Sequence, residues 1–121
     1  MKKTIVFLGL VTGLSSCYFD KAEKIYPASA CDVSNVTYAA TIAPIMAKNC
    51  ALSGCHDAAT ASGGYVLNSY AGVQAVAYSG RLMGAVKHES GYSAMPQSAD
   101  QLDACTINKL QTWVDAGALN N

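Results

Sequence analysis

The stretch Cys50-Ala51-Leu52-Ser53-Gly54-Cys55-His56 decides how the rest of the chain is interpreted. A histidine directly after the second of two cysteines is the order that attaches haem covalently, through two thioethers and an iron-bound imidazole. The usual motif has two residues between the cysteines, whereas this one has four. Gly54 can adopt the positive φ that a wider loop requires. The stretch therefore predicts thioethers from Cys50 and Cys55 and iron ligation by His56. Attachment through Cys55 alone, with Cys50 in a disulfide, is the alternative.

The first sixteen residues have the pattern of an export leader, with a basic start at Lys2 and Lys3 and an apolar run over residues 5–14. The sequence Leu14-Ser15-Ser16-Cys17 then resembles a bacterial lipobox. We therefore expect residues 1–16 to be removed and Cys17 to be lipidated. An ordinary secretory leader with a stray cysteine is the alternative.

These signals predict three segments: the leader, a lipid-anchored tether over residues 17–35, and a domain over residues 36–121. They predict an exported lipoprotein, facing the periplasm or lying at the outer membrane or cell surface. That compartment is oxidising, so the four remaining cysteines are expected to be paired or otherwise occupied. The chain has 8 basic and 8 acidic residues, which gives no indication of nucleic-acid binding.

Apolar residues at helical spacing predict an all-α domain. We expect helices over residues 37–49, from Asn68 or Ser69 to about 78, and over 81–87. The last helix is expected to begin at Asp103, or earlier at Ser98, and to end at Gly117. Pro44 lies within the first of these, so it should kink that helix or mark its true start.

A six-coordinate haem requires a second axial ligand, and Met95 is the candidate. It precedes Pro96 in a polar loop before the last predicted helix, a poor place for a methionine that only fills a core. His88 in the same loop is the alternative ligand.

The chain also resembles the small class I-like c-type cytochrome domains found in exported proteins of Bacteroidetes and Planctomycetes. The resemblance covers about residues 36–121. It rests on the order of these pieces: Ile42-Ala43-Pro44-Ile45-Met46, Asn49-Cys50, Cys55-His56, Gly63-Gly64-Tyr65-Val66-Leu67-Asn68-Ser69-Tyr70-Ala71-Gly72-Val73, Met95-Pro96 and Trp113-Val114-Asp115-Ala116-Gly117-Ala118.

This resemblance implies three to five helices around one haem c, with His56 and Met95 on opposite sides of the iron. Since Cys50 and Cys55 would be consumed by haem and the terminal helices pack together in this fold, it also implies a disulfide between Cys31 and Cys105. Trp113 is expected near the haem edge or simply in the core.

The function expected from these features is electron transfer to or from a redox partner protein that the sequence does not identify. We expect no enzymatic activity. Three alternatives remain: a zinc-binding module using Cys50, Cys55 and His56 with Cys105 or His88, a haem enzyme in which Met95 is detached, and a lipoprotein module with two disulfides and no haem.

Overall fold

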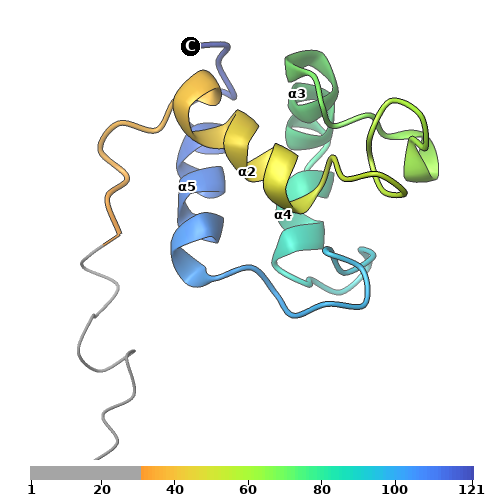
Figure 1. Cartoon of the computed structure of the whole chain (residues 1–121). Coiled ribbons are helices and arrows are strands. Elements are labelled where there is room, and N and C mark those ends of the chain that lie inside the picture. The colour runs from red at the N-terminus through yellow and green to blue at the C-terminus, as the bar shows by residue number, and fades with distance from the viewer. Residues whose placement is uncertain (1–30) are drawn as a thin grey trace, which may run out of the picture.

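The computed structural model describes residues 31–121, so the predicted leader, the lipidation site Cys17 and most of the tether lie outside the described residues. The described part contains helices and no strand, which confirms the all-α prediction. In chain order the helical elements are the π-helix η2 (Tyr38–Ile42), α2 (Ala43–Asn49), the 3₁₀ turn η3 (Ser62–Gly64), α3 (Tyr70–Tyr78), α4 (Arg81–Val86) and α5 (Ala104–Asp115) (Figure 1). None of the helices in residues 31–121 is long and apolar enough to cross a membrane.

The first predicted helix consists of two helical segments that meet beside Pro44. Thr37 caps the N-terminus of η2, where its hydroxyl accepts a hydrogen bond from the Ala40 amide at 3.2 Å. The wide turn of η2 is marked by the Ile42 amide, which donates to the Thr37 carbonyl at 3.1 Å. Pro44 lies in the first turn of α2, and the backbone stays right-handed helical through Ile42 and Ala43. Of the two outcomes expected at Pro44, the start of an α-helix is the one observed, because the chain changes here from π-helix to α-helix.

The later helices begin and end close to their predicted boundaries because their signals are local. Ser69 caps α3 by accepting from the Gly72 amide at 3.3 Å, and Asp103 caps α5 by accepting from the Thr106 amide at 2.9 Å. Gly80 and Gly117 have φ values of 74° and 92°, which interrupt the chain before α4 and after α5.

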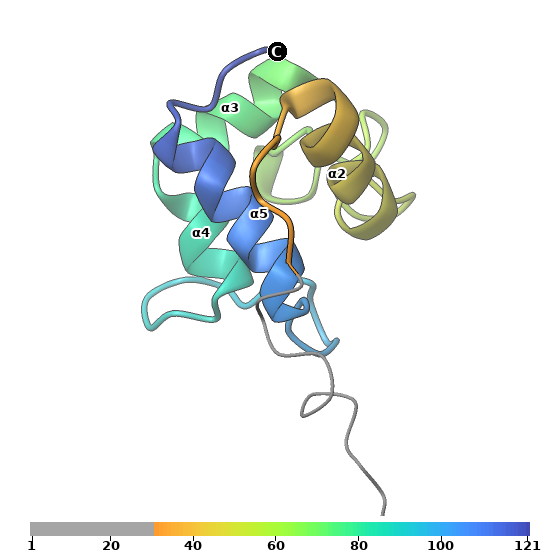
Figure 2. The same ribbon diagram turned by 90° about the vertical axis from the view of Figure 1, so that its left-hand side faces the viewer.

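The core lies where α5 packs against η2 and α4 while α3 packs against α4 (Figures 1 and 2). Its largest fully buried side chains are Trp113, Ile42, Met46, Leu110 and Val73. Trp113 donates its indole N–H to the Leu119 carbonyl at 2.9 Å, so its polar atom is satisfied inside the core. The C-terminal Asn121 accepts at its backbone oxygen from the Ala39 amide at 2.9 Å, which ties the end of the chain to η2.

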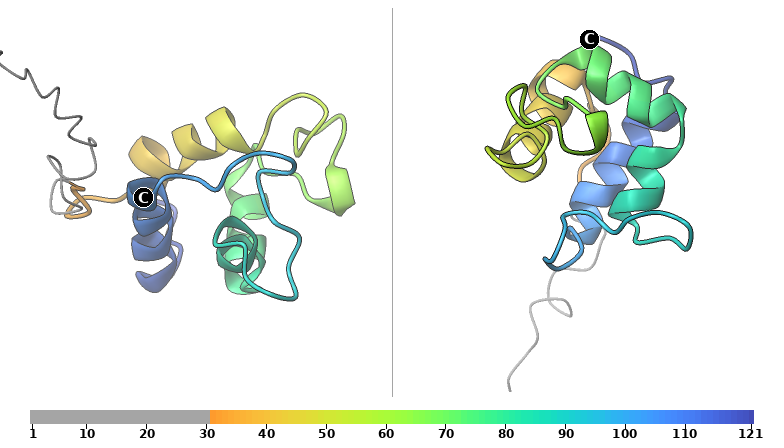
Figure 3. Two further views of the ribbon diagram at one scale, coloured as in Figure 1. Left: turned by 90° about the horizontal axis from the view of Figure 1, so that it is seen from below. Right: turned by 90° about the vertical axis from the view of Figure 1, so that its right-hand side faces the viewer.

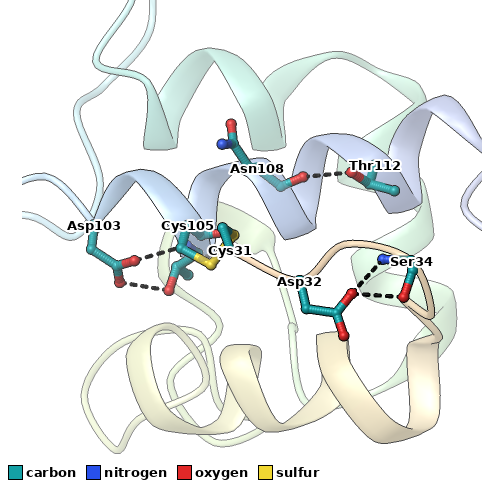
Figure 4. Close-up of a disulfide and its surroundings, with 8 residues drawn as sticks. Cys31, Asp32, Ser34, Asp103, Cys105, Asn108 and Thr112 are labelled. Atoms are coloured by element: carbon teal, nitrogen blue, oxygen red, sulfur yellow. Dashed lines mark hydrogen bonds between the residues drawn. A yellow bond between two sulfur atoms is a disulfide. The ribbon is translucent and has the colours of Figure 1, made fainter. Parts of the chain in front are cut away.

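A disulfide joins Cys31 to Cys105, the pair that the sequence analysis expected (Figure 4). It connects the segment before η2 to the first turn of α5, and the two Cα atoms are 5.4 Å apart. The sequence separation is 74 residues. Closing a loop of this length in the unfolded chain corresponds to about 4 kcal/mol of stabilisation in the chain-entropy account.

Candidate functional site

The Cys50–His56 loop turns back on itself immediately after α2. The Cys50 amide continues the helical pattern by donating to the Met46 carbonyl at 2.9 Å. The Cys55 amide then donates to the Leu52 carbonyl at 2.9 Å, and Gly54 takes a φ of 83°, the positive value expected for it. Finally, the His56 amide donates to the Cys50 carbonyl at 3.2 Å. The four-residue spacer is thus accommodated as a bulge, and the two ends of the motif have adjacent backbones.

Both cysteines of this loop carry free thiols, with Cys50 half-buried and Cys55 exposed. Burial raises the pKa of Cys50 to about 11, and the neighbouring Cys55 contributes to the same shift. Cys50 is therefore held as a neutral thiol at physiological pH. The alternative in which Cys50 is paired in a disulfide, and the alternative with two disulfides, both differ from this structure.

The ring of His56 is oriented by a backbone carbonyl from the segment that follows η3. Its Nδ1 atom lies 3.2 Å from the Tyr65 carbonyl oxygen. Because a carbonyl can only accept, Nδ1 carries the hydrogen and Nε2 is left with its lone pair. The His56 carbonyl in turn accepts from the Leu67 amide at 2.8 Å. The half-buried imidazole is thereby fixed in the tautomer that can bind a metal through Nε2.

The carbonyl of Tyr65 is held in place by a close approach of the next residue to α3. A Cβ atom added at Gly72 would overlap the Val66 carbonyl oxygen. The segment containing Tyr65 can therefore lie against α3 only because residue 72 is glycine. Sequence reasoning included Gly72 and Tyr65 in the resemblance but assigned neither of them a role. A glycine inside an otherwise sound helix was the available signal.

The loop after α4 carries the two candidates for the second axial ligand. Met95 is half-buried, and its amide donates to the Ala85 carbonyl at 3.0 Å. His88 is exposed, and its Nε2 lies 3.1 Å from the Met95 carbonyl oxygen, to which it donates. In this arrangement His88 helps to fix the backbone of Met95.

The Cys50–His56 segment and the Met95 loop leave the ends of two different helices. In Figure 1 the yellow-green segment after α2 extends to the upper right, whereas the cyan-blue segment after α4 lies below that helix and runs back toward α5. Seen from the right-hand side, the yellow-green segment lies at the upper left and the cyan-blue segment at the bottom (Figure 3, right). The disulfide, by contrast, lies along α5 (Figure 4).

The side chains of Trp113, Tyr70 and Arg81 each have structural partners within the described residues. Trp113 is 1% exposed and belongs to the core. The Tyr70 hydroxyl donates to the Ala118 carbonyl at 2.9 Å. The Arg81 guanidinium lies 5.9 Å from the centre of the Tyr65 ring, which is a cation–π geometry.

A cavity of about 270 Å³ lies along the alanine face of α2. It is lined by Tyr38, Ala43, Ala47, Ala51, Leu67 and Asn68. None of the candidate haem ligands or thioether cysteines lines it, but it borders the site through Ala51 of the Cys50–His56 loop and through Leu67, whose amide donates to the His56 carbonyl.

Within residues 31–121, no group of three or more histidine, cysteine or acidic side chains is arranged to hold a metal ion. Cys105, one candidate for a zinc site, is bonded to Cys31. The chain was also compared with protein-family models, curated proteins and solved structures, and no match was found.

Proposed function

We propose that this chain is an electron-transfer protein with one covalently attached haem c, in a class I-like cytochrome c fold. Cys50 and Cys55 would form the thioethers, His56 would bind the iron on one side, and Met95 would bind it on the other. The observation that carries the proposal is the geometry of the closed loop. The His56 amide meets the Cys50 carbonyl, and the His56 ring keeps Nε2 free by donating Nδ1–H to Tyr65.

The residues present fit such a group in their donor chemistry. Two unpaired thiols belong to one loop, as thioether formation requires, and an imidazole of fixed tautomer follows the second of them. A thioether side chain, that of Met95, lies on a second loop, which follows α4 (Figure 1). Bound haem would supply a one-electron redox centre.

The protein's own contribution is to bind, orient and shield this group. The hydrogen bond from His56 to Tyr65 increases the basicity of the iron ligand. A methionine ligand raises the reduction potential relative to a second histidine. The role that we propose for the domain is electron carriage between partner proteins, with no substrate chemically changed.

The proposal is tested by producing the full chain with a c-type cytochrome maturation system. Haem that remains on the protein after denaturation and acid-acetone extraction is the expected result. The matched control is the Cys50→Ser/Cys55→Ser double variant, which keeps the Cys31–Cys105 disulfide and should be colourless. A colourless wild-type protein would instead favour the module stabilised by a disulfide or zinc.

The ligand assignment is tested on the same material. The position of the pyridine haemochrome band distinguishes a haem with one thioether from a haem with two. The wild type should show the band for two thioethers, and Cys50→Ser should show the band for one. A weak near-infrared band typical of methionine–iron ligation should be lost in Met95→Ala and kept in His88→Ala. A wild type that lacks this band, with a six-coordinate iron that becomes five-coordinate in His88→Ala, would assign the sixth position to His88. A wild type that lacks the band and already has an open iron position would favour a haem enzyme.

We further propose that the chain is exported and anchored to a membrane through lipid on Cys17, which follows a lipobox-like sequence. Metabolic labelling with a radioactive fatty acid should mark the wild type but not Cys17→Ser. Equal labelling of both would refute the anchor and leave the haem proposal standing.

A further inference from the structure

The aromatic ring of Tyr92 packs against α4 at two glycines, Gly84 within the helix and Gly80 just before it. A Cβ atom added at Gly84 would be 2.5–2.6 Å from three ring atoms of Tyr92. One turn earlier, a Cβ atom at Gly80 would lie 3.8 Å from the Tyr92 hydroxyl. The ring therefore occupies the space that a side chain at position 84 would fill.

This contact accounts for a glycine that helix formation alone would disfavour. Glycine in a helix interior is less favourable than alanine by about 1 kcal/mol. Gly84 is buried inside α4 and does not have a positive φ, so backbone conformation gives no reason for it. The three atoms nearest to a Cβ at position 84 all belong to the Tyr92 ring, which a larger residue would displace.

The same stretch of α4 holds the backbone of the Met95 loop. The Glu89 amide donates to the Gly84 carbonyl at 2.9 Å, at the start of the loop. The Met95 amide donates to the Ala85 carbonyl at 3.0 Å, and the Met95 carbonyl accepts from His88 at 3.1 Å. Tyr92 lies between these anchor points in sequence, so its ring sets how closely the loop approaches the helix.

We propose that Gly84 and Tyr92 form a seat that positions the Met95 thioether as the sixth ligand of the haem iron. The inference rests on the proposed function for its ligand role. Gly84 and Tyr92 are positioning residues: they act through the backbone of the loop, and the Met95 sulfur makes the bond. If the loop were displaced, the Met95 sulfur would move away from the iron. The bonds from Cys50, Cys55 and His56 would still keep the haem attached.

The test uses the full-length holoprotein in five forms besides wild type: Gly84→Ala, Tyr92→Ala, their double variant, Tyr92→Phe, and Tyr78→Ala. Tyr78 is an exposed tyrosine on α3, at 67% exposure, so its removal is the matched control for Tyr92→Ala. Two quantities are measured: the near-infrared methionine–iron band per haem, and the exchange rate of the Met95 amide by NMR.

We expect Gly84→Ala to lose most of the near-infrared band at unchanged haem content and to exchange the Met95 amide at least about tenfold faster, as a locally loosened segment does. Tyr92→Phe keeps the ring and should match wild type, as should Tyr78→Ala. The double variant should match Tyr92→Ala in both band intensity and amide exchange rate. Without the Tyr92 ring, the methyl group added at position 84 has nothing to displace.

Wild-type band intensity and wild-type amide exchange in Gly84→Ala would overturn the proposal. Additive losses in the double variant would also overturn it, because they would mean that the methyl group added at position 84 acts on something other than the Tyr92 ring. If the wild-type chain carried no haem, the proposed function would fail separately. The amide exchange would still test the seat, because the bond between Met95 and Ala85 belongs to the chain itself.

Discussion

The Nδ1 atom of His56 lies 3.2 Å from the carbonyl oxygen of Tyr65, and the chain beyond that carbonyl touches α3 at Gly72. The orientation of the His56 imidazole thus depends on the lack of a side chain at Gly72. This glycine lies in α3, which contains none of the candidate ligands. The consequence can be tested at the glycine.

Gly72→Ala should destabilise the protein by about 2 kcal/mol, because the added Cβ collides with the Val66 carbonyl. Helix propensity alone predicts the opposite sign, a gain of up to about 1 kcal/mol. Urea unfolding of the holoprotein measures the difference. Ala71→Gly, at the exposed neighbouring position, reports the propensity effect by itself. A stabilised Gly72→Ala variant would show that the Val66 segment can move away at little cost.

Cys55 should be alkylated much faster than Cys50 in the chain produced without haem. Cys55 is exposed, whereas burial raises the pKa of Cys50 to about 11 and keeps that thiol protonated. Mass spectrometry after timed iodoacetamide treatment at pH 8 measures both rates. Equal rates in the native protein would contradict the burial of Cys50, and both thiols should react alike in urea.

The raised pKa of Cys50 also predicts a pH dependence of stability for the same haem-free chain. The folded state holds the proton more tightly than the unfolded state, whose thiol has the ordinary pKa of 9.0. The contribution is complete below pH 9 and is lost as the pH rises toward 11, by up to about 3 kcal/mol. Cys50→Ala should remove this slope, which urea midpoints at each pH would reveal.

Breaking the Cys31–Cys105 disulfide should lower the free energy of unfolding by about 2–4 kcal/mol. Cys31→Ser, Cys105→Ser and the double variant should lose the same amount, because each removes the same bond. Thermal and urea unfolding compare the three. A double variant twice as destabilised as either single variant would mean that the two positions act independently.

Asp103→Ala should cost about 1 kcal/mol, because the carboxylate caps α5. Hydrogen bonds from the Thr106 side chain and backbone lower the pKa of Asp103 below its usual value. Its ionised form therefore stabilises the fold above the unfolded pKa, and this contribution is lost as the pH falls through the folded pKa. Asp103→Asn keeps a capping oxygen and should flatten the acid limb of the stability profile.

The sequence predicted those parts of the fold whose signals are local. Ser69 and Asp103 cap α3 and α5 through side chains that bond only three residues away, and Gly117 ends α5 through its own φ. The all-α class and the start of α2 beside Pro44 followed from similar short-range patterns. The haem, the ligand set and the lipid anchor stay predictions.

What the sequence could not supply depends on contacts between distant residues. The π-helical start at Tyr38 is bonded to Asn121 at the other end of the chain. The support of His56 by Tyr65 requires α3 to be in place, and the seat of Tyr92 requires α4. A helical glycine lies at each of these two contacts, Gly72 in α3 and Gly84 in α4. A lone glycine in a helical pattern does not, however, indicate which segment packs against it.

The disulfide also determines where a mechanical load would enter the domain. When the chain is held beyond Cys105, a pull at Cys31 passes through the sulfur bridge into the first turn of α5, because the bridge closes residues 32–104 into a loop (Figure 4). The helix that precedes Cys50 is thus isolated from tension on the N-terminal side. Reduction of the bridge would redirect the same force along the backbone into η2 and α2, toward the loop that holds His56.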